Sequence, residues 1–169
     1  MSRPAPNVSE TATARDDDQR QIIGRNAGNR ITLITHSFRQ LTGNELVPAT
    51  PDVANALWSA PIVVLAHGTE ADPVFFYGNR AALDIFEIGA EEFIRLPSRF
   101  SAEPLLREDR ARLLERVTRE NYISDYAGVR IARTGKRFRI EQATVWNLID
   151  RDGAIHGQAA AFDRWIPLD

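Results

Sequence analysis

Two polar turn sequences, Arg133-Thr134-Gly135-Lys136 and Asp150-Arg151-Asp152-Gly153, enclose a segment (137–149) in which side-chain character alternates. Glycine-containing turns between segments with a period of two are typical of antiparallel hairpins. The segment therefore predicts the middle strand of a three-stranded meander, with outer strands at 123–132 and 154–165. Successive side chains of a strand point to opposite faces, and we expect one set to face the core: Phe138, Ile140, Gln142, Thr144, Trp146 and Leu148.

Two more strands are predicted upstream of the meander, with helices between. Residues 61–66 contain a β-branched run and residues 74–77 an aromatic run, with a polar turn separating them. Asn79 has the position of an N-cap for a helix over 80–87, and a longer helix is predicted at 105–121. This element order is that of a PAS domain. We therefore predict an α+β fold: a PAS-like five-stranded antiparallel sheet with short helices on one face and an N-terminal helical extension.

The N-terminal third is expected to lie outside that sheet. Residues 1–17 are polar and predict a disordered tail, residues 18–59 form the helical extension, and the PAS-like domain occupies 60–166. The extension carries an apolar stripe with helical spacing, which needs an apolar cover: Ile23, Ala27, Ile31, Ile34, Phe38 and Leu41. We expect a homodimer to complete this cover over Ala143 and Val145. The alternative is a monomer whose helix folds back on its own sheet.

The composition narrows the available chemistry. The chain has no cysteine, and 21 basic against 23 acidic residues give a net charge of −2, so we expect no nucleic-acid partner. The histidines, His36, His67 and His156, lack metal-ligand spacing, and no glycine-rich phosphate loop is present. No apolar run approaches the roughly 20 residues of a membrane span. We expect a cytoplasmic protein with no metal, no cofactor and no membrane partner.

Several segments resemble the MEKHLA domain, a PAS-like family. The longest are Tyr77-Gly78-Asn79-Arg80-Ala81-Ala82-Leu83, Leu96-Pro97-Ser98-Arg99-Phe100 and Glu141-Gln142-Ala143-Thr144-Val145-Trp146-Asn147. The resemblance runs from roughly His36 to Phe162 and implies a PAS-like fold. In plants the family is known as the C-terminal module of homeodomain–leucine zipper transcription factors, and bacteria carry stand-alone versions. It brings no catalytic residue or cofactor site to transfer to this chain.

Candidate pocket residues are polar or aromatic side chains on elements that line the cavity of PAS-like folds. They are His67, Asn79, Arg80, Arg99, Asp125, Arg130, Gln142, Thr144 and Trp146. The alternative for the charged ones is ion pairing between elements, and for the histidine a bond to the backbone of its turn. The last strand is nearly bare at Gly157, Ala159 and Ala161, which leaves room either for a ligand or for a closely packed helix.

We predict a non-enzymatic sensory, ligand-binding or protein-interaction module. A small apolar or aromatic molecule would lie between the sheet and the short helices, and its binding would be reported through the N-terminal helix or a partner. One alternative is a structural dimerisation scaffold with a filled core. Another is an enzyme that uses the same cavity, although the sequence offers no nucleophile elbow and no metal spacing. A cavity above roughly 300 Å³ favours the sensor, and a packed interior favours the scaffold.

Overall fold

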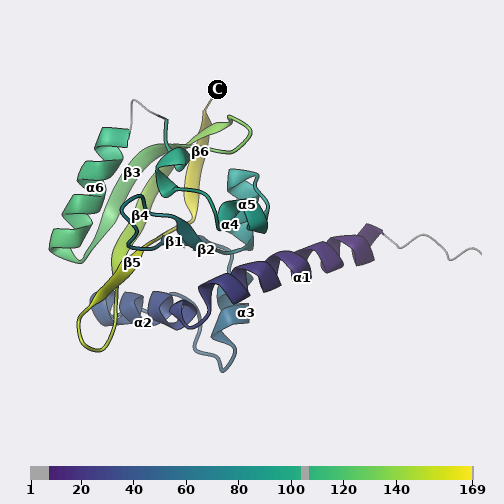
Figure 1. The fold of residues 1–169 in the computed structure, drawn as a ribbon, viewed down its shortest axis with the longest axis horizontal. Helices are drawn as coiled ribbons and strands as arrows, with labels where there is room; N and C mark the ends of the chain where they lie inside the picture. The colour runs from purple at the N-terminus through teal and green to yellow at the C-terminus, as the bar shows by residue number, and fades with distance from the viewer. Residues whose placement is uncertain (1–7, 104–106, 169) are drawn as a thin grey trace, which may run out of the picture.

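In the computed structural model, which describes residues 8–103 and 107–168, six antiparallel strands form one sheet (Figure 1). The strand order is β2-β1-β5-β4-β3, and β6 also pairs with β4. Their bounds are β1 Val63–His67, β2 Phe75–Gly78, β3 Tyr122–Ile131, β4 Arg137–Ile149, β5 Ile155–Phe162 and β6 Arg164–Leu168. The meander and the two upstream strands are confirmed.

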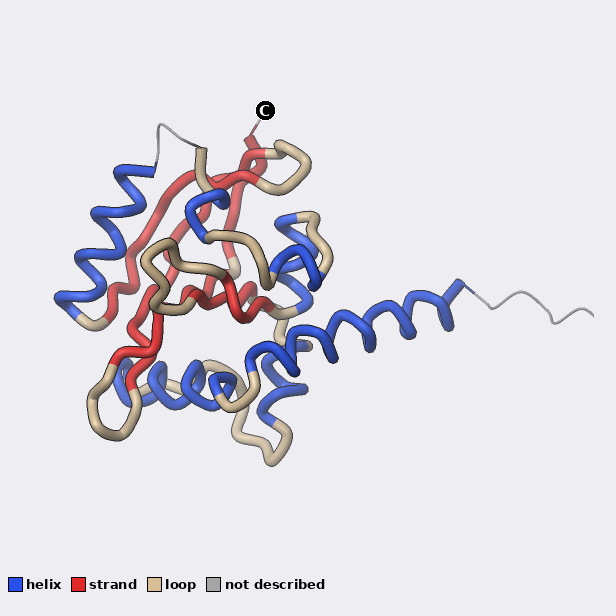
Figure 2. Tube along the Cα trace, viewed as in Figure 1, coloured by secondary structure: helices blue, strands red, loops and turns tan. Residues whose placement is uncertain are grey.

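Helices cover both faces of the sheet (Figure 2). They are α1 Val8–Ala27, α2 Arg30–Thr42, α3 Val53–Trp58, α4 Arg80–Phe86, α5 Ala90–Phe93, the 3-10 helix η1 Ser98–Ser101 and α6 Arg107–Glu120. α2 packs on β4 from one side, whereas α4, α5, η1 and α6 lie on the other. α1 runs past the edge strand β2, and its N-terminal part extends away from the body (Figure 1).

The final strand is divided in two, which makes six strands where five were predicted. Thr144 pairs with Ala161 and Glu141 pairs with Arg164, so β5 and β6 keep the same register against β4. The break falls at Asp163, opposite Gln142. The predicted strand 154–165 thus corresponds to β5 and the start of β6, which run along β4 in one register with a break between them.

At Gln142 the alternation of side chains along β4 is reversed: residues after it point to the opposite face from the one that a regular strand would give them. Gln142 has a φ of 50°, a left-handed conformation that interrupts the pleat of the strand. Ile140 and Val145 consequently line the same side, although they are an odd number of positions, five, apart. The prediction of one core face from Phe138 to Leu148 is therefore wrong beyond Gln142, because a shift of one residue inverts every following side chain.

The N-terminal region is more helical than predicted. α1 begins at Val8, so the disordered tail is wrong for residues 8–17, while residues 1–7 lie outside the described part. The apolar stripe from Ile23 to Leu41 lies on two helices, α1 and α2, because Gly28 adopts a φ of 56° between them. That left-handed conformation suits glycine, which has no Cβ to clash.

The apolar stripe of these helices is covered within the chain itself. Ile23, Ala27 and Ile34 are buried, and Ile31, Phe38 and Leu41 pack against the same core. The face of β4 that carries Trp146 covers the stripe. Nε1 of Trp146 donates to the carbonyl oxygen of Ile34 at 3.3 Å. The expected landing site is wrong, since Val145 lies under α6 instead. The stripe therefore needs no second copy, and the homodimer stays a prediction.

Candidate ligand site between the sheet and helix α6

A small cavity lies between the sheet and the helices on its α6 side. Its volume is about 50 Å³. Most of its wall is apolar, with Leu65, Phe75 and Phe86 among the contributors. Its polar lining comes from β1, β3, β5, η1 and α6 and consists of His67, Ser101, Arg110, Tyr126, Arg130 and Gln158. The cavity therefore combines an apolar wall with polar side chains from several elements, as small-molecule sites do.

Two arginines in this lining are buried without a carboxylate partner. Arg110 of α6 and Arg130 of β3 are each 9% exposed, and neither forms an ion pair with any residue that the structure describes. Burial, together with the positive charge of Arg130, lowers the pKa of Arg110 to about 10. The Arg110 guanidinium remains charged at pH 7. Buried charges of this kind are costly unless something compensates them.

His67 presents an acceptor nitrogen to the interior. Its Nδ1 lies 2.9 Å from the carbonyl oxygen of Gly68, which can only accept, so Nδ1 carries the proton. Burial lowers the pKa of His67 to about 4, and the ring is neutral at pH 7. Its Nε2 therefore holds a lone pair, is buried, and has no hydrogen-bond partner among the described residues.

Gln158 lies directly opposite His67 in the pairing of β5 with β1. Its Nε2 donates to the carbonyl oxygen of Leu114 at 3.1 Å and to Oδ1 of Asn147 at 3.1 Å. These acceptors fix the orientation of the amide, because a carbonyl oxygen cannot donate. The Oε1 atom is buried and is also without a partner in the described chain. Two unpartnered acceptors thus accompany two unpaired guanidiniums.

The structure brings only His67 and Arg130 of the predicted site residues into this cavity. Asn79 is fully buried as the N-cap of α4, where its Oδ1 accepts from the backbone N–H of Ala82 at 3.1 Å and from Val64 at 3.0 Å. Its Nδ2 donates to the carbonyl oxygens of Leu57 and Ile62. All of these bonds are internal, so Asn79 is structural here.

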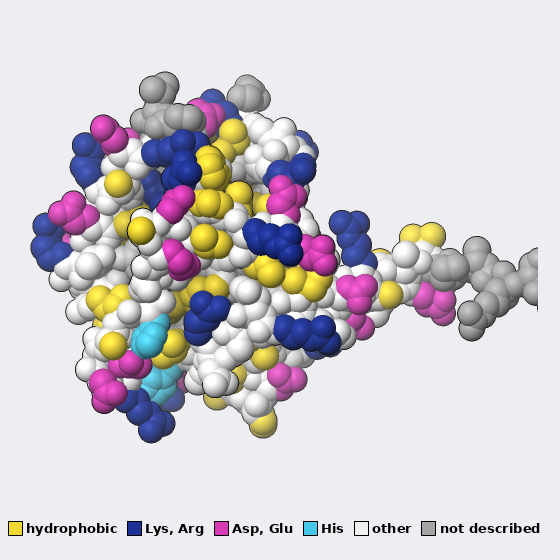
Figure 3. Space-filling model, viewed as in Figure 1, with side chains coloured by type: hydrophobic (Ala, Val, Ile, Leu, Met, Phe, Trp, Pro, Cys, Tyr) yellow, Lys and Arg dark blue, Asp and Glu magenta, His cyan; other side chains and the backbone are white. Residues whose placement is uncertain are grey.

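Three predicted charged residues form ion pairs between elements instead. The pairs and their distances are Arg80 with Asp16 at 2.6 Å, Arg99 with Asp72 at 3.1 Å, and Asp125 with Arg116 at 3.8 Å. Side chains of both signs are interspersed over the face in Figure 3, and no region of one sign dominates it. Placing these three residues in the pocket is therefore wrong, and the ion-pair alternative describes them.

The β4 candidates also lie outside the cavity. Gln142 is exposed and accepts a hydrogen bond from Nη1 of Arg164 at 2.8 Å. Thr144 and Trp146 follow the reversal and lie on the α2 side. Trp146 is fully buried, as predicted, but it packs edge-on against Phe38 at 4.9 Å. In the last strand, Gly157 allows β5 to pack closely against β1, because a Cβ at this position would lie 2.0 Å from the carbonyl oxygen of His67.

Sequence reasoning missed Arg110 and Gln158. A signal for Arg110 was present, because it lies three, four and seven positions before Leu113, Leu114 and Val117, which form the apolar stripe of α6. A charge within an apolar stripe is the unusual observation. Gln158 gave no comparable signal. The residues two positions away on the same face of the strand, His156 and Ala160, are not large apolar side chains.

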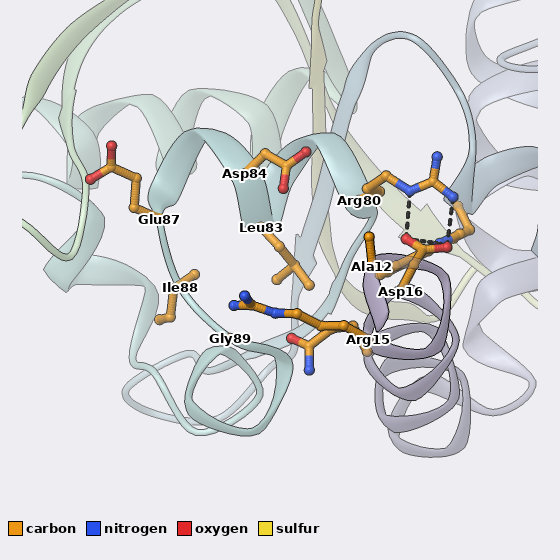
Figure 4. A pocket seen from close by; sticks show the side chains of 11 residues that line it. Ala12, Arg15, Asp16, Arg80, Leu83, Asp84, Glu87, Ile88 and Gly89 are labelled. Atoms are coloured by element: carbon orange, nitrogen blue, oxygen red, sulfur yellow. Dashed lines mark hydrogen bonds and ion pairs between the residues drawn. The ribbon is translucent and has the colours of Figure 1, made fainter. Parts of the chain in front are cut away.

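A second, larger cleft lies between α1 and α4 (Figure 4). Its volume is about 520 Å³, and Trp58, Leu83 and Ile88 are among its apolar residues. Asp16 and Arg80 close one end with two bonds of 2.6 and 2.7 Å. The hydrogen bonds from Arg80 hold the pKa of Asp16 below its usual value. This charge pair satisfies itself, and none of the buried, unpartnered side-chain atoms of the described residues belongs to this cleft.

Comparison with known proteins identifies the family. The model of the MEKHLA domain matches residues 29–167. The chain belongs to the MEKHLA domain family. Curated relatives of this MEKHLA domain include homeobox-leucine zipper protein HOX32 of Oryza sativa subsp. japonica, 26% identical over 140 residues, and ATHB-9 of Arabidopsis thaliana, 28% identical over 144 residues. Each alignment covers 78% of this chain but only 16% and 17% of the relative, so the chain spans about a sixth of their length.

Solved structures confirm the PAS-like fold of this MEKHLA domain. A PAS domain of a protein from Colwellia psychrerythraea superposes with a TM-score of 0.55 at 12% identity, covering 68% of this chain and 92% of that one. A light-oxygen-voltage domain, studied with a flavin analogue, gives 0.53 at 15% identity and covers 70% and 85%. At these identities the likeness concerns the fold alone.

No helix within residues 8–103 and 107–168 is long and apolar enough to cross a membrane. No group of three or more histidine, aspartate or glutamate side chains there is arranged to hold a metal ion.

Proposed function

We propose that this MEKHLA domain is a non-enzymatic sensory module that binds a small molecule in the cavity beneath α6. One observation carries the proposal: a mostly apolar cavity is lined by two guanidiniums without an ion-pair partner and by two residues with unpartnered acceptors, His67 Nε2 and Gln158 Oε1. An unsatisfied buried polar group costs on the order of 1–3 kcal/mol. In a purely structural core, apolar residues would avoid that cost.

The ligand is smaller than the sequence suggested. A volume of about 50 Å³ is far below the roughly 300 Å³ of a drug-sized site, so an aromatic molecule does not fit without rearrangement. The small volume is also the observation that favours the alternative, a dimerisation scaffold with a nearly filled core. The polar groups without a partner support a small polar ligand over the scaffold.

Helix α6 is the element best placed to report binding. Arg110, Leu113 and Leu114 reach the cavity from α6. Its C-terminal half is already fixed, since Val117 packs on Val145 and the Val117 carbonyl accepts from Asn147 Nδ2 at 3.0 Å. A ligand that contacts Arg110 would therefore tie the N-terminal half of α6 to the sheet. Through this change the domain would signal to a partner.

Thermal unfolding of the full chain, with and without a panel of small charged and neutral polar molecules, tests the proposal. We expect at least one compound to raise the Tm, because it binds the folded state alone. The variant Leu113→Phe narrows the cavity from a half-buried position and should abolish that shift. Native mass spectrometry of the purified chain should show the molecule it retains. No stabilising compound, or shifts that persist in Leu113→Phe, would contradict the proposal.

A further inference from the structure

We infer that the cavity beneath α6 is selective for a small 2-hydroxycarboxylate, of the size of glycolate or lactate. The inference rests on the proposed function and specifies its ligand. It follows from four residues that line one small cavity: Arg110 and Arg130, which form no ion pair with a described residue, and His67 and Gln158, each with a buried acceptor atom that has no described partner.

The two arginines require an anion. Arg130 uses one bond on its own strand, from Nη1 to the Val129 carbonyl oxygen at 2.9 Å, and its guanidinium lies 5.3 Å from the ring centre of Tyr126. Asp72, whose charge reaches Arg110, is already paired with Arg99 at 3.1 Å. No described carboxylate forms an ion pair with either buried guanidinium. A carboxylate ligand fits them because its two oxygens match the planar N–H donors of arginine.

The two acceptors require a donor on the same ligand. His67 Nε2 and Gln158 Oε1 belong to residues that face each other across β1 and β5, so their Cβ atoms are about 4.5–5.5 Å apart. A carboxylate offers these atoms no proton, whereas a hydroxyl offers one. An ammonium group would also donate, but it would add a third positive charge beside Arg110 and Arg130. The neutral hydroxyl is therefore the better match.

The size of the cavity places the hydroxyl next to the carboxylate. A volume of about 50 Å³ admits only a few non-hydrogen atoms, since each water needs roughly 10–15 Å³ on such a measure. A hydroxyl on a distant carbon would not fit. The apolar wall at Leu65, Phe75 and Phe86 suits a methylene or methyl group, which phosphate and bicarbonate lack.

Calorimetric titration of the full chain with four probes tests the inference: glycolate, acetate, glycolamide and inorganic phosphate. Acetate removes only the hydroxyl, and glycolamide removes the charge and replaces one acceptor oxygen with an NH2 donor. We expect glycolate to bind at least about tenfold more tightly than each of the others, because each lacks one required contact. Equal affinity of acetate would overturn the role of the hydroxyl. Equal affinity of glycolamide would overturn the role of the charge, and tighter phosphate would replace the ligand class.

Two variants of α6 supply a matched comparison. Arg110→Gln removes the buried guanidinium, and Arg112→Gln removes an exposed one two residues away. We expect the first to lose glycolate binding at least about tenfold and the second to leave it unchanged. Should Arg110→Gln fail to fold, Arg130→Gln serves in its place, and the four-probe series on the unchanged chain still decides. If only neutral compounds bind, and Leu113→Phe blocks them, this inference fails while the proposed function stands.

Discussion

His67 and Gln158 face each other across β1 and β5, and each leaves one buried acceptor atom without a partner. Both side chains are otherwise fixed: the imidazole by the Gly68 carbonyl and the amide by acceptors on α6 and β4. The unpartnered atoms are therefore held in position and not free to turn toward another group. This pair links the sheet to α6 at the cavity.

The first prediction concerns pH. The pKa of His67 is about 4 in the folded chain, against 6.5 for an ordinary histidine, because burial disfavours the charged ring; Arg110 lowers it further and Glu70 opposes the shift. Between these values the unfolded chain binds the extra proton. Stability contributed by neutral His67 is thus complete above pH 6.5 and is lost as the pH falls from 6.5 to 4, by about 3 kcal/mol.

Chemical unfolding of the chain and of His67→Gln across that range measures the effect. A buffer free of carboxylates adds no ligand of the proposed class. We expect the free energy of unfolding of the unchanged chain to fall more steeply with acid than that of the variant. Parallel profiles for the two proteins would show that His67 is not buried in its neutral form.

Trp146→Ala should lower the free energy of unfolding by about 3–5 kcal/mol, since it opens a void between β4 and α2. The ring is fully buried, contacts Phe38 and donates to the Ile34 carbonyl. Because Trp146 lies on the face away from the cavity, the variant should still bind glycolate where it remains folded. A variant that melts within a degree or two of the unchanged chain would contradict this placement.

Asn79→Ala should lower the free energy of unfolding by about 2–4 kcal/mol, through loss of the α4 cap and exposure of unsatisfied backbone groups. The buried side chain serves Val64, Ala82, Leu57 and Ile62 together. Asn44→Ala, at an exposed position, is the control and should change stability little. Similar denaturation midpoints for the two variants would refute the structural role of Asn79.

Gln142 tests the reversal in β4. Its φ of 50° costs a non-glycine residue roughly 1–2 kcal/mol, and a β-branched side chain tolerates it worse. We expect Gln142→Val to lower the free energy of unfolding by about 1–2 kcal/mol, and Gln142→Gly not to lower it. If valine were tolerated as well as glycine, β4 would be a regular strand and the sequence-based face assignment would hold.

The sequence predicted the order of elements because turns and caps are local signals. The glycine turns at Gly135 and Gly153 both adopt positive φ, and Asn79 caps α4 as expected. The faces of β4 were not predictable, because glutamine is not a residue type that signals a left-handed backbone. One such residue moved Trp146 from the expected pocket to the α2 interface.

The candidate site was predictable only in part. His67 and Arg130 sit on strands whose position followed from the fold, and both reach the cavity. Arg80, Arg99 and Asp125 resembled them in sequence but found carboxylate or guanidinium partners on neighbouring elements. Tertiary packing decides which charged side chains find an ion-pair partner and which are buried. The local sequence pattern does not contain that information.

Association of two copies remains to be tested. The buried stripe around Ile34 removes the original reason for a dimer, while the exposed Trp165 and Ile166 on β6 offer another apolar surface. Sedimentation of the full chain at tens of micromolar separates the cases. A dimeric mass would support the prediction, and a single monomeric mass would end it.

Backbone amide hydrogen exchange in α6 tests the central claim most directly. The full chain would be measured without ligand and with glycolate, or with whichever panel compound raises the Tm most. We predict slower exchange in Arg107–Glu120 and at His67 and Gln158, with α1 unchanged, because the ligand ties Arg110 to the sheet. Unchanged exchange in α6, or protection confined to the cleft between α1 and α4, would contradict a ligand site beneath α6.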